Sequence, residues 1–356
     1  MSEYAKMRLD LFSSNRHWRC ECLSNGEAAY RHFDLGSCRS FFTDTQNRFA
    51  YLYKRFQPCL LTQKSQRFRF IKMPDDLFIV TYPKCGTTWV QNIVASIFRD
   101  GKPFQSALEF LADTPFLEMT GAQAAENMKR PGAIKFHLPY YMTPQSPDAK
   151  YIFVARNPKD CCVSFYHHTE GIPGYQFEEG EFDDFFELFM NGEVDFGDYF
   201  DCVLSWYEHR NDPNVLFITY EELKKDIKSN VLKIAQFIGP QYKEKLEKDE
   251  KMLNDVILHS SFNFMKEHLN NHFKEMEKIP KEMIVNNPDV PAGLRKMFES
   301  DFKMSKKDSQ GVTFVRKGIV GDWRNYFSPT QNARLEKRFR ERTAGTDLHN
   351  LWKDDM

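Results

Sequence analysis

Residues 77–98 read LFIVTYPKCGTTWVQNIVASIF, and their order of apolar and polar residues predicts three consecutive elements. Residues 77–82 are almost wholly apolar, which is typical of a strand buried on both faces of a parallel sheet. The proline and the glycine within residues 83–87 predict a tight turn, and residues 88–98 predict a helix. The sequence therefore predicts a strand, a short loop and a helix in direct succession.

The loop between these two elements carries the residues expected of an anion site. Lys84, Gly86, Thr87 and Thr88 surround the helix start, where the first amides have no intrahelical partner and the helix dipole is positive. Gly86 lets the backbone approach an anion closely. A chance tight turn is the alternative. A P-loop of the nucleoside-triphosphatase type is excluded, because that motif needs a lysine directly after its second glycine, and Thr87 follows Gly86 here.

The same order of elements recurs twice further along the chain. Residues 151–155 form a second apolar run that leads into Pro158, and residues 215–220 form a third that leads into a charged helix start. A helix is predicted between them, from Tyr199 to Arg210. Alternating strands and helices predict an α/β fold of three layers with a central parallel sheet. Ligands bind beyond the carboxyl ends of such strands, so the first loop is a P-loop-like strand-loop-helix phosphate site.

This loop resembles the 5′-phosphosulfate-binding loop of the cytosolic sulfotransferase family, usually written TYPKSGTTW. Residues 81–89 depart from it only at Cys85, where the family has serine, and the change costs little if the position contributes mainly a backbone amide. The resemblance runs from about Asp75 to the C-terminus, roughly four-fifths of the chain. It implies a sulfotransferase that uses 3′-phosphoadenosine 5′-phosphosulfate (PAPS) and releases 3′,5′-phosphoadenosine (PAP).

Arg156 and Ser164 form a second candidate anion site, since a guanidinium fork and a hydroxyl both donate to phosphate oxygens. From the residues alone, an ion pair between Arg156 and a nearby carboxylate is an equal alternative. The resemblance implies that both residues hold the 3′-phosphate, and RKGIVGDW, residues 316–323, resembles the family's signature RKGxxGDW. By resemblance, Trp89 and Tyr220 flank the adenine. The cofactor-binding residues implied in this way are Lys84, Cys85, Gly86, Thr87, Thr88, Trp89, Arg156, Ser164, Tyr220, Ser260, Phe262, Phe314, Arg316, Lys317 and Gly318.

A candidate reacting centre lies in residues 133–139, a strand-like run that ends at a proline. Lys135 and His137 are two residues apart, so a strand would present both on one face. The run is similar to the family's KTHLP, whose histidine is the catalytic base, and imidazole titrates near neutral pH. His167 and His168 are competing candidates for the base. The catalytic residues implied by the resemblance are His137, Lys84, Lys135 and Ser164, with the lysines stabilising the transferring group.

Three regions of the chain differ in their residue pattern. Residues 1–70 lack sustained periodicity and are interpreted as an N-terminal extension or peripheral segment, and residues 71–356 as one sulfotransferase domain. Within that domain, residues 266–311 are rich in Lys, Glu, Asn and Pro. They are interpreted as an insertion, which is either a solvated segment with one or two short helices or a lid over an acceptor pocket.

The composition limits the function classes. A formal net charge of −1 gives no global field that would attract nucleic acid or a membrane surface, so any anion site must be local. No apolar run is long enough to span a bilayer, and the N-terminus lacks the pattern of a secretory signal. The eight cysteines are therefore expected to be free thiols in a cytoplasmic protein. Their spacing predicts no metal site.

These features combine into one functional hypothesis. It is a sulfotransferase that transfers the sulfuryl group of PAPS, without a metal, by in-line displacement to a hydroxyl or amine of a small aromatic or hydrophobic acceptor. A non-catalytic nucleotide-binding protein on the same scaffold is the main alternative, and a membrane-tethered glycan or tyrosine sulfotransferase and a small-molecule kinase are weaker ones. The sequence identifies no particular acceptor. The family's dimer motif, KxxxTVxxxE, is not matched at residues 324–333, so monomer and dimer both stay open.

Overall fold

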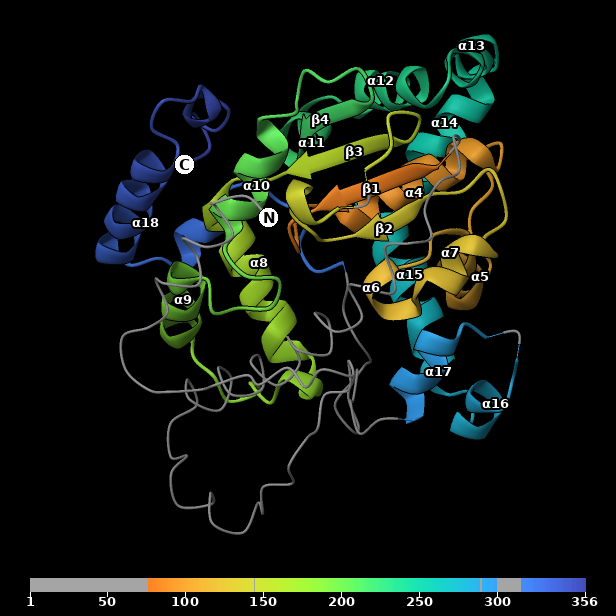
Figure 1. Cartoon of the computed structure of the whole chain (residues 1–356), viewed down its shortest axis with the longest axis horizontal. Coiled ribbons are helices and arrows are strands. Elements are labelled where there is room, and N and C mark those ends of the chain that lie inside the picture. The colour runs from red at the N-terminus through yellow and green to blue at the C-terminus, as the bar shows by residue number, and fades with distance from the viewer. Residues whose placement is uncertain (1–75, 144, 289, 300–314) are drawn as a thin grey trace, which may run out of the picture. The chain divides into compact units, whose positions relative to one another are not determined.

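A parallel sheet of four strands forms the centre of the described chain (Figure 1). The computed structural model describes residues 76–143, 145–288, 290–299 and 315–356, so the extension expected at 1–70 lies outside the described residues. The strands run in the order β2-β1-β3-β4, and all their pairings are parallel. Their carboxyl ends therefore meet at one edge of the sheet. The strand bounds are β1 (Leu77–Thr81), β2 (Ile134–Phe136), β3 (Lys150–Ala155) and β4 (Val215–Thr219).

Helices cover both faces of this sheet (Figure 1). The helices that pack on one face are α4 (Thr87–Phe98), α11 (Tyr220–Lys225), α12 (Ile227–Ile238), α13 (Pro240–Lys248) and α14 (Glu250–His259). Those that pack on the other are α8 (Pro158–Gly171), α9 (Phe182–Asn191), α10 (Tyr199–Tyr207) and α18 (Pro329–Arg342). The short elements are α6 (Leu117–Thr120), α7 (Ala122–Glu126), η2 (Tyr140–Met142), η3 (Pro173–Tyr175), η4 (Asp322–Asn325) and η5 (Leu348–Asn350).

Alternate side chains of the strands supply the two hydrophobic clusters. Ile79 and Ile152 belong to the cluster of α4, α12 and α14, whereas Phe78 and Phe153 belong to that of α8, α9 and α10. Successive strand residues point to opposite faces, so an almost wholly apolar strand presents an apolar surface to both helix layers. The predicted three-layer α/β fold is therefore confirmed.

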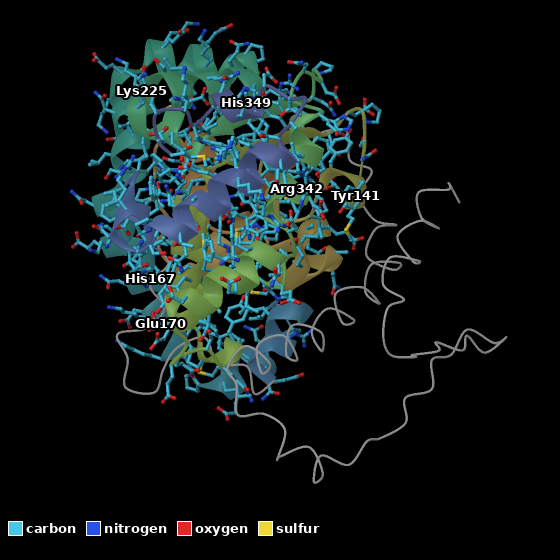
Figure 2. The ribbon with its side chains drawn as sticks, turned by 90° about the vertical axis from the view of Figure 1, so that its left-hand side faces the viewer. Tyr141, His167, Glu170, Lys225, Arg342 and His349 are labelled. Carbon is cyan, nitrogen blue, oxygen red and sulfur yellow. The ribbon has the colours of Figure 1, made fainter. Side chains whose placement is uncertain are left out.

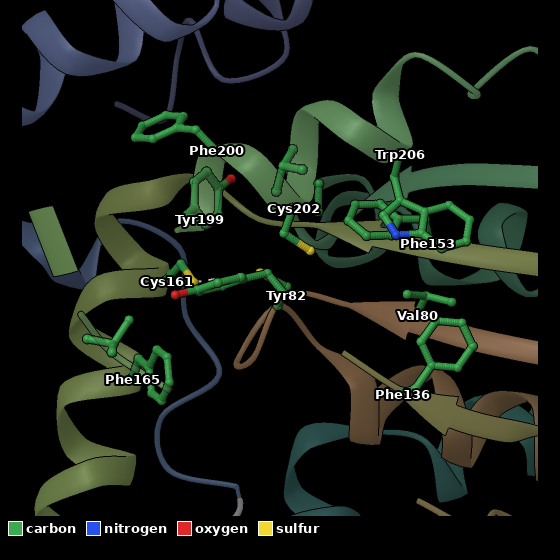
Figure 3. Close-up of a cluster of buried hydrophobic side chains, with 14 of the residues drawn as sticks. Val80, Tyr82, Phe136, Phe153, Cys161, Phe165, Tyr199, Phe200, Cys202 and Trp206 are labelled. Carbon is green, nitrogen blue, oxygen red and sulfur yellow. Dashed lines mark hydrogen bonds between the residues drawn. The ribbon is translucent and has the colours of Figure 1, made fainter. Parts of the chain in front are cut away.

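Aromatic side chains fill the cluster beside α8 and α10 (Figure 3). Trp206 stacks on Phe153 with ring centroids 5.3 Å apart, and Tyr82, directly after β1, meets Phe165 and Tyr199 edge-on. Each large apolar side chain buried in this way contributes about 1.5–3 kcal/mol. The strand ends that carry the candidate site therefore rest on a tightly packed core.

The helices that follow the strand ends begin where the sequence supplies a cap. The side chain of Asn157 caps α8 by accepting from the amide of Asp160. Thr219 caps α11 in a capping box, in which Thr219 and Glu222 each accept a hydrogen bond from the other's amide. This box ends β4 at Thr219, so Tyr220 is the first residue of α11. The prediction that the strand extends through Tyr220 was wrong.

The segment at 266–311 contains more helix than expected. Leu269 and Phe273 of α15 are buried in a third hydrophobic cluster with Phe110 of α5. Since apolar residues follow at intervals of three and four along α15, one face of that helix is packed and the segment is not simply solvated. The elements concerned are α5 (Ala107–Asp113), α15 (Phe262–Glu277, 16 residues), α16 (Lys281–Val285) and α17 (Ala292–Glu299).

The C-terminal part of the chain is bonded to the edge where the strands end. Trp352 Nε1 donates to Glu221 at 2.8 Å, and Glu221 in turn accepts from the amide of Asn157 at 3.0 Å. Asp160 accepts from the amides of Gly321 at 2.6 Å and of Trp323 at 2.9 Å. The bonds of Asp160 hold residues 321 and 323 against the start of α8. Within the described residues, no helix combines the length and apolar character needed to cross a bilayer.

Candidate active site

A cavity of about 770 Å³ lies at this edge, and side chains that follow or end all four strands line it. It joins the two predicted anion sites and the predicted base in one space. Phe314 lies outside the described residues, and Cys85 is not on the cavity wall. The predicted site residues that line the cavity are Lys84, Gly86, Thr87, Thr88, Trp89, Lys135, His137, Arg156, Ser164, Tyr220, Ser260, Phe262, Arg316, Lys317 and Gly318.

The loop after β1 adopts the conformation that its glycine allows. Gly86 is the N-cap of α4 with φ of 103°, a left-handed conformation that glycine adopts without strain. A Cβ at this position would lie 3.0 Å from the ring of Tyr220. Below it, the hydroxyls of Thr87 and Thr81 are 2.6 Å apart. The loop thus leaves the first amides of α4 directed toward the cavity end of the helix, as an anion site requires.

Cys85 points into the core. Its side chain is fully buried, with Sγ 3.8 Å from the carbonyl oxygen of Pro83 and 3.7 Å from Sγ of Cys161. Its amide donates to the carbonyl oxygen of Tyr82 at 3.3 Å. The sulfur that replaces the family's serine oxygen therefore contacts protein atoms. The role predicted for Cys85 in binding can only come from its backbone.

Three cationic side chains, those of Lys84, Lys135 and Arg156, line the cavity together. Burial, Lys135 and Arg156 lower the pKa of Lys84 to about 7, and burial lowers the pKa of Lys135 to about 8 against the opposing effect of Glu118. Arg156 donates to the carbonyl oxygens of Lys84 and Ile319, and its guanidinium lies 4.4 Å from the ring centroid of Tyr220. Desolvated like charges destabilise one another, so this arrangement favours a bound anion.

Three predicted cofactor-binding residues also hold buried polar atoms that have no hydrogen-bond partner among the described residues. These atoms are Nε1 of Trp89, Nε of Arg156 and Oγ of Ser260. Buried polar atoms are normally paired, with protein or with a ligand. All three side chains line the same cavity, so their donors fit a polar ligand there.

The second basic segment is held by one carboxylate. Asp322 accepts from Arg316 at 2.7 Å and from Lys317 at 2.9 Å, and these bonds lower the pKa of Asp322 to about 2 although burial opposes them. Gly318 has φ of 64°, and a Cβ there would lie 2.3 Å from the ring of Phe262. Arg316, Lys317, Gly318 and the ring of Phe262 thus form one close-packed wall of the cavity.

His137 is oriented by the strand beside it. Its Nδ1 lies 2.8 Å from the carbonyl oxygen of Thr81. A carbonyl can only accept, so Nδ1 carries the proton and Nε2 of the neutral ring is the basic nitrogen. Burial, Lys135 and Lys84 hold the pKa of His137 well below its usual value. The ring lies between those of Phe116 and Phe196, with centroids 5.2 Å and 5.0 Å away. The neutral form is the one that can take a proton.

The competing histidines occupy different parts of the cavity. His168 Nδ1 lies 3.4 Å from Nζ of Lys84, and burial together with Lys84 keeps the pKa of His168 well below its usual value. His167 lies near Glu170 toward the end of α8, with its Nε2 2.8 Å from the hydroxyl of Tyr326 (Figure 2). Ser164 lines the cavity wall, but within the described residues no hydrogen bond joins it to Lys84 or Lys135.

The remainder of the cavity wall is mostly apolar and aromatic. It comes from segments between the predicted elements and from α15, and it includes the acid Asp195; Glu170, near the end of α8, is a second acid on the cavity wall. Sequence reasoning singled out neither Asp195 nor Tyr175, because neither belongs to a periodic or motif-like run. The wall residues of this part are Phe110, Leu111, Phe116, Met119, Ile172, Tyr175, Asp195, Phe196, Met265, Phe273, Met276 and Leu294.

Fold and cavity together define an α/β protein that gathers cationic side chains and a histidine in one cavity at the carboxyl ends of its strands. A family profile described as the sulfotransferase domain matches residues 74–347. The chain belongs to the sulfotransferase family, and it is a sulfotransferase enzyme by that membership.

Individual relatives agree with this family. The chain is 33% identical to sulfotransferase 1C2 of Rattus norvegicus over 298 residues, which covers 80% of this chain and 88% of the relative. It is 34% identical to sulfotransferase 1E1 of Cavia porcellus over 289 residues, covering 78% and 86%. Among solved structures, the mouse sulfotransferase SULT7A1 complexed with PAP matches with a TM-score of 0.60 and 31% identity, covering 82% of this chain and 92% of the other.

Proposed function

We propose that this protein transfers the sulfuryl group of PAPS to a hydroxyl or amine of a small, hydrophobic acceptor, with His137 as the base. The observation that carries the proposal is the single cavity that contains Lys84, Arg156 and His137. A ligand with phosphates at two ends can reach both cationic positions while its reacting end faces the histidine. The mostly apolar wall beyond His137 suits a hydrophobic acceptor.

The chain offers a partner for each part of PAPS. Lys84 and the loop amides would hold the 5′-phosphosulfate, and Arg156 with Ser164 the 3′-phosphate. The wall formed by Arg316, Lys317 and Gly318 would close over the same nucleotide. The unpartnered donors of Trp89, Arg156 and Ser260 support this arrangement, because a polar ligand would satisfy them. No group of His, Cys, Asp and Glu suited to a metal ion occurs among the described residues.

The residues of the cavity can carry out the transfer by positioning and electrostatics. His137 Nε2 takes the proton of the acceptor as its oxygen or nitrogen attacks sulfur, and the Thr81 carbonyl holds the Nδ1 proton in place. Lys84 and Lys135, when protonated, stabilise the charge that grows on the departing phosphate and on the transferring group. The attacking and leaving atoms lie in line, as in phosphoryl transfer. The cytoplasmic location stays a prediction, and the oligomeric state, monomer or dimer, stays open.

The test is transfer of labelled sulfate from PAPS to a panel of phenols, catecholamines, sterols and alcohols by the full-length protein. Labelled product is expected with EDTA present and with no ATP. A protein that binds PAP tightly but sulfates no acceptor would be a non-catalytic nucleotide-binding protein. A requirement for ATP and Mg²⁺ would identify a kinase, and either result would overturn the proposal.

A further inference from the structure

Two acids line the cavity, Asp195 and Glu170, and Glu170 lies beside His167. Asp195 lies in the segment between α9 and α10 and lines the cavity wall. Its Oδ2 accepts from the hydroxyl of Tyr175 at 2.9 Å, and its Oδ1 accepts from the amide of Phe196 at 3.1 Å. Each carboxylate oxygen therefore has one neutral donor and room for another, since an oxygen of this kind accepts more than one hydrogen bond.

Asp195 lines the cavity with neutral donors only, unlike Asp322. Asp322 is paired with Arg316 and Lys317, whereas within the described residues no lysine or arginine forms an ion pair with Asp195. Burial raises the pKa of Asp195 to about 6 against the opposing effect of its two hydrogen bonds. A desolvated carboxylate without a cation is costly, so a cation supplied by a ligand would stabilise it.

Aromatic contacts connect this acid to the reacting centre. The ring of Phe196, the next residue, lies 5.0 Å from that of His137. On the other side, the ring of Tyr175 lies 6.1 Å from that of His168, which contacts Lys84. An acceptor whose reacting group approaches His137 would thus place the rest of its body within reach of Asp195. Aromatic faces beside the acid would add cation–π attraction.

We propose that Asp195 binds a protonated amine on the acceptor, at a position separate from the group that receives sulfate. The preferred acceptors are then small aromatic compounds that carry both a hydroxyl and an ammonium group. The inference rests on the proposed function for the position of the reacting group. The hydrogen bond from Tyr175 holds the carboxylate toward the cavity, so Tyr175 is a positioning residue for Asp195.

The experiment compares tyramine and 4-ethylphenol, which share the 4-ethylphenol body and of which only tyramine carries an ammonium group. Their affinities for the full-length protein are measured by titration calorimetry at pH 7.4, with PAP saturating and again without PAP. The parent is expected to bind tyramine at least about tenfold more tightly, since a buried charged hydrogen bond is worth about 1.5–3 kcal/mol and tenfold is about 1.4 kcal/mol. Equal affinities in the parent would overturn the proposal without any variant.

Variants separate recognition from a structural role. Asp195→Asn is expected to remove the preference for tyramine and to leave the affinity for 4-ethylphenol within about threefold. Glu193→Gln removes a charge from an exposed position on the same segment and should keep the parent's preference. Loss of both affinities in Asp195→Asn would assign the acid a structural role and overturn the proposal. If that variant does not fold, Tyr175→Phe, which keeps the carboxylate but removes the hydrogen bond that positions it, should bind tyramine with a smaller preference than the parent, and an unchanged or larger preference would overturn the proposal.

A parallel assay of transfer from PAPS keeps the two proposals distinct. Preferential binding of tyramine without sulfation of any acceptor would refute the proposed function and support the cation site. Sulfation of 4-ethylphenol and tyramine with equal KM would support the proposed function and overturn the role of Asp195.

Discussion

Raising the pH from 7 to 9 should weaken PAP binding strongly, because Lys84 has to be protonated to hold an anion. Burial, Lys135 and Arg156 lower the pKa of free Lys84 to about 7. A bound phosphate would raise that pKa, since an opposite charge favours the ammonium form. The affinity is therefore highest at low pH, where free Lys84 is already charged, and it falls as the pH rises above 7.

The size of the effect follows from the protonated fraction of Lys84 in the free protein. With a pKa of about 7, about half of Lys84 is protonated at pH 7 and about 1% at pH 9. If bound Lys84 stays protonated over this range, the dissociation constant rises about 50-fold, or about 2.3 kcal/mol. A lysine with the reference pKa of about 10.4 would change it by less than about 1.1-fold. The second ionisation of a phosphate, near pH 6, lies largely below this range.

Titration calorimetry of PAP at intervals between pH 7 and pH 9, at constant ionic strength, measures this slope. Lys84→Arg keeps a cation that does not titrate at this position, so its affinity should vary much less than the parent's, and by at most about tenfold if Lys135, with a pKa of about 8, also contacts the phosphate. Lys245→Arg makes the same exchange at an exposed position and should keep the parent's slope. A change below about threefold in the parent, or equal slopes in the parent and Lys84→Arg, would refute the reasoning.

Three further substitutions test other parts of the site. His137→Ala should slow sulfation of a phenol by about 10²–10⁴-fold and leave PAP affinity within about threefold, and a rate above about a tenth of the parent's would exclude His137 as the base. Gly318→Ala should weaken PAP binding at least about tenfold, because the new Cβ would lie 2.3 Å from the ring of Phe262. Gly345→Ala is the control, since Gly345 also has a positive φ, of 82°, but nothing lies within 4 Å of a Cβ there. This control has the backbone strain without the clash and should bind PAP normally. Asp160→Ala leaves two buried amides without an acceptor and should lower the free energy of unfolding in urea by about 2–4 kcal/mol, and an unchanged midpoint would contradict that role.

The strands and the phosphate loop could be predicted because their signals are local. The apolar run before Lys84 and the glycine after it are adjacent in the sequence, and β1 and α4 begin and end within about one residue of their predicted bounds. Tyr220 was assigned to the wrong element for a local reason too. A β-propensity pattern extends through Tyr220, but the capping box of Thr219 and Glu222 starts the helix there.

The acceptor side of the cavity could not be predicted because its residues meet only through the tertiary fold. Asp195, Tyr175 and His168 come from three different segments, and none belongs to a motif with fixed spacing. Burial shifts the pKa values of Asp195 and His168, and no spacing in the sequence reveals that burial. Asp160 lies close to Arg156 in the sequence, but its partners Gly321 and Trp323 lie more than 160 residues later. α15, in contrast, had a detectable signal in its apolar spacing.

The bonds from Trp352 to Glu221 and from Asp160 to residues 321 and 323 tie the nucleotide end of the cavity to the last part of the chain. During synthesis, the strands and the phosphate loop leave the ribosome long before these partners do. The growing polypeptide therefore cannot complete these contacts of its nucleotide pocket until Trp352 has been synthesised. A premature stop codon shortly before Trp352 would spare every residue that lines the cavity and still leave a carboxylate at its base unsupported.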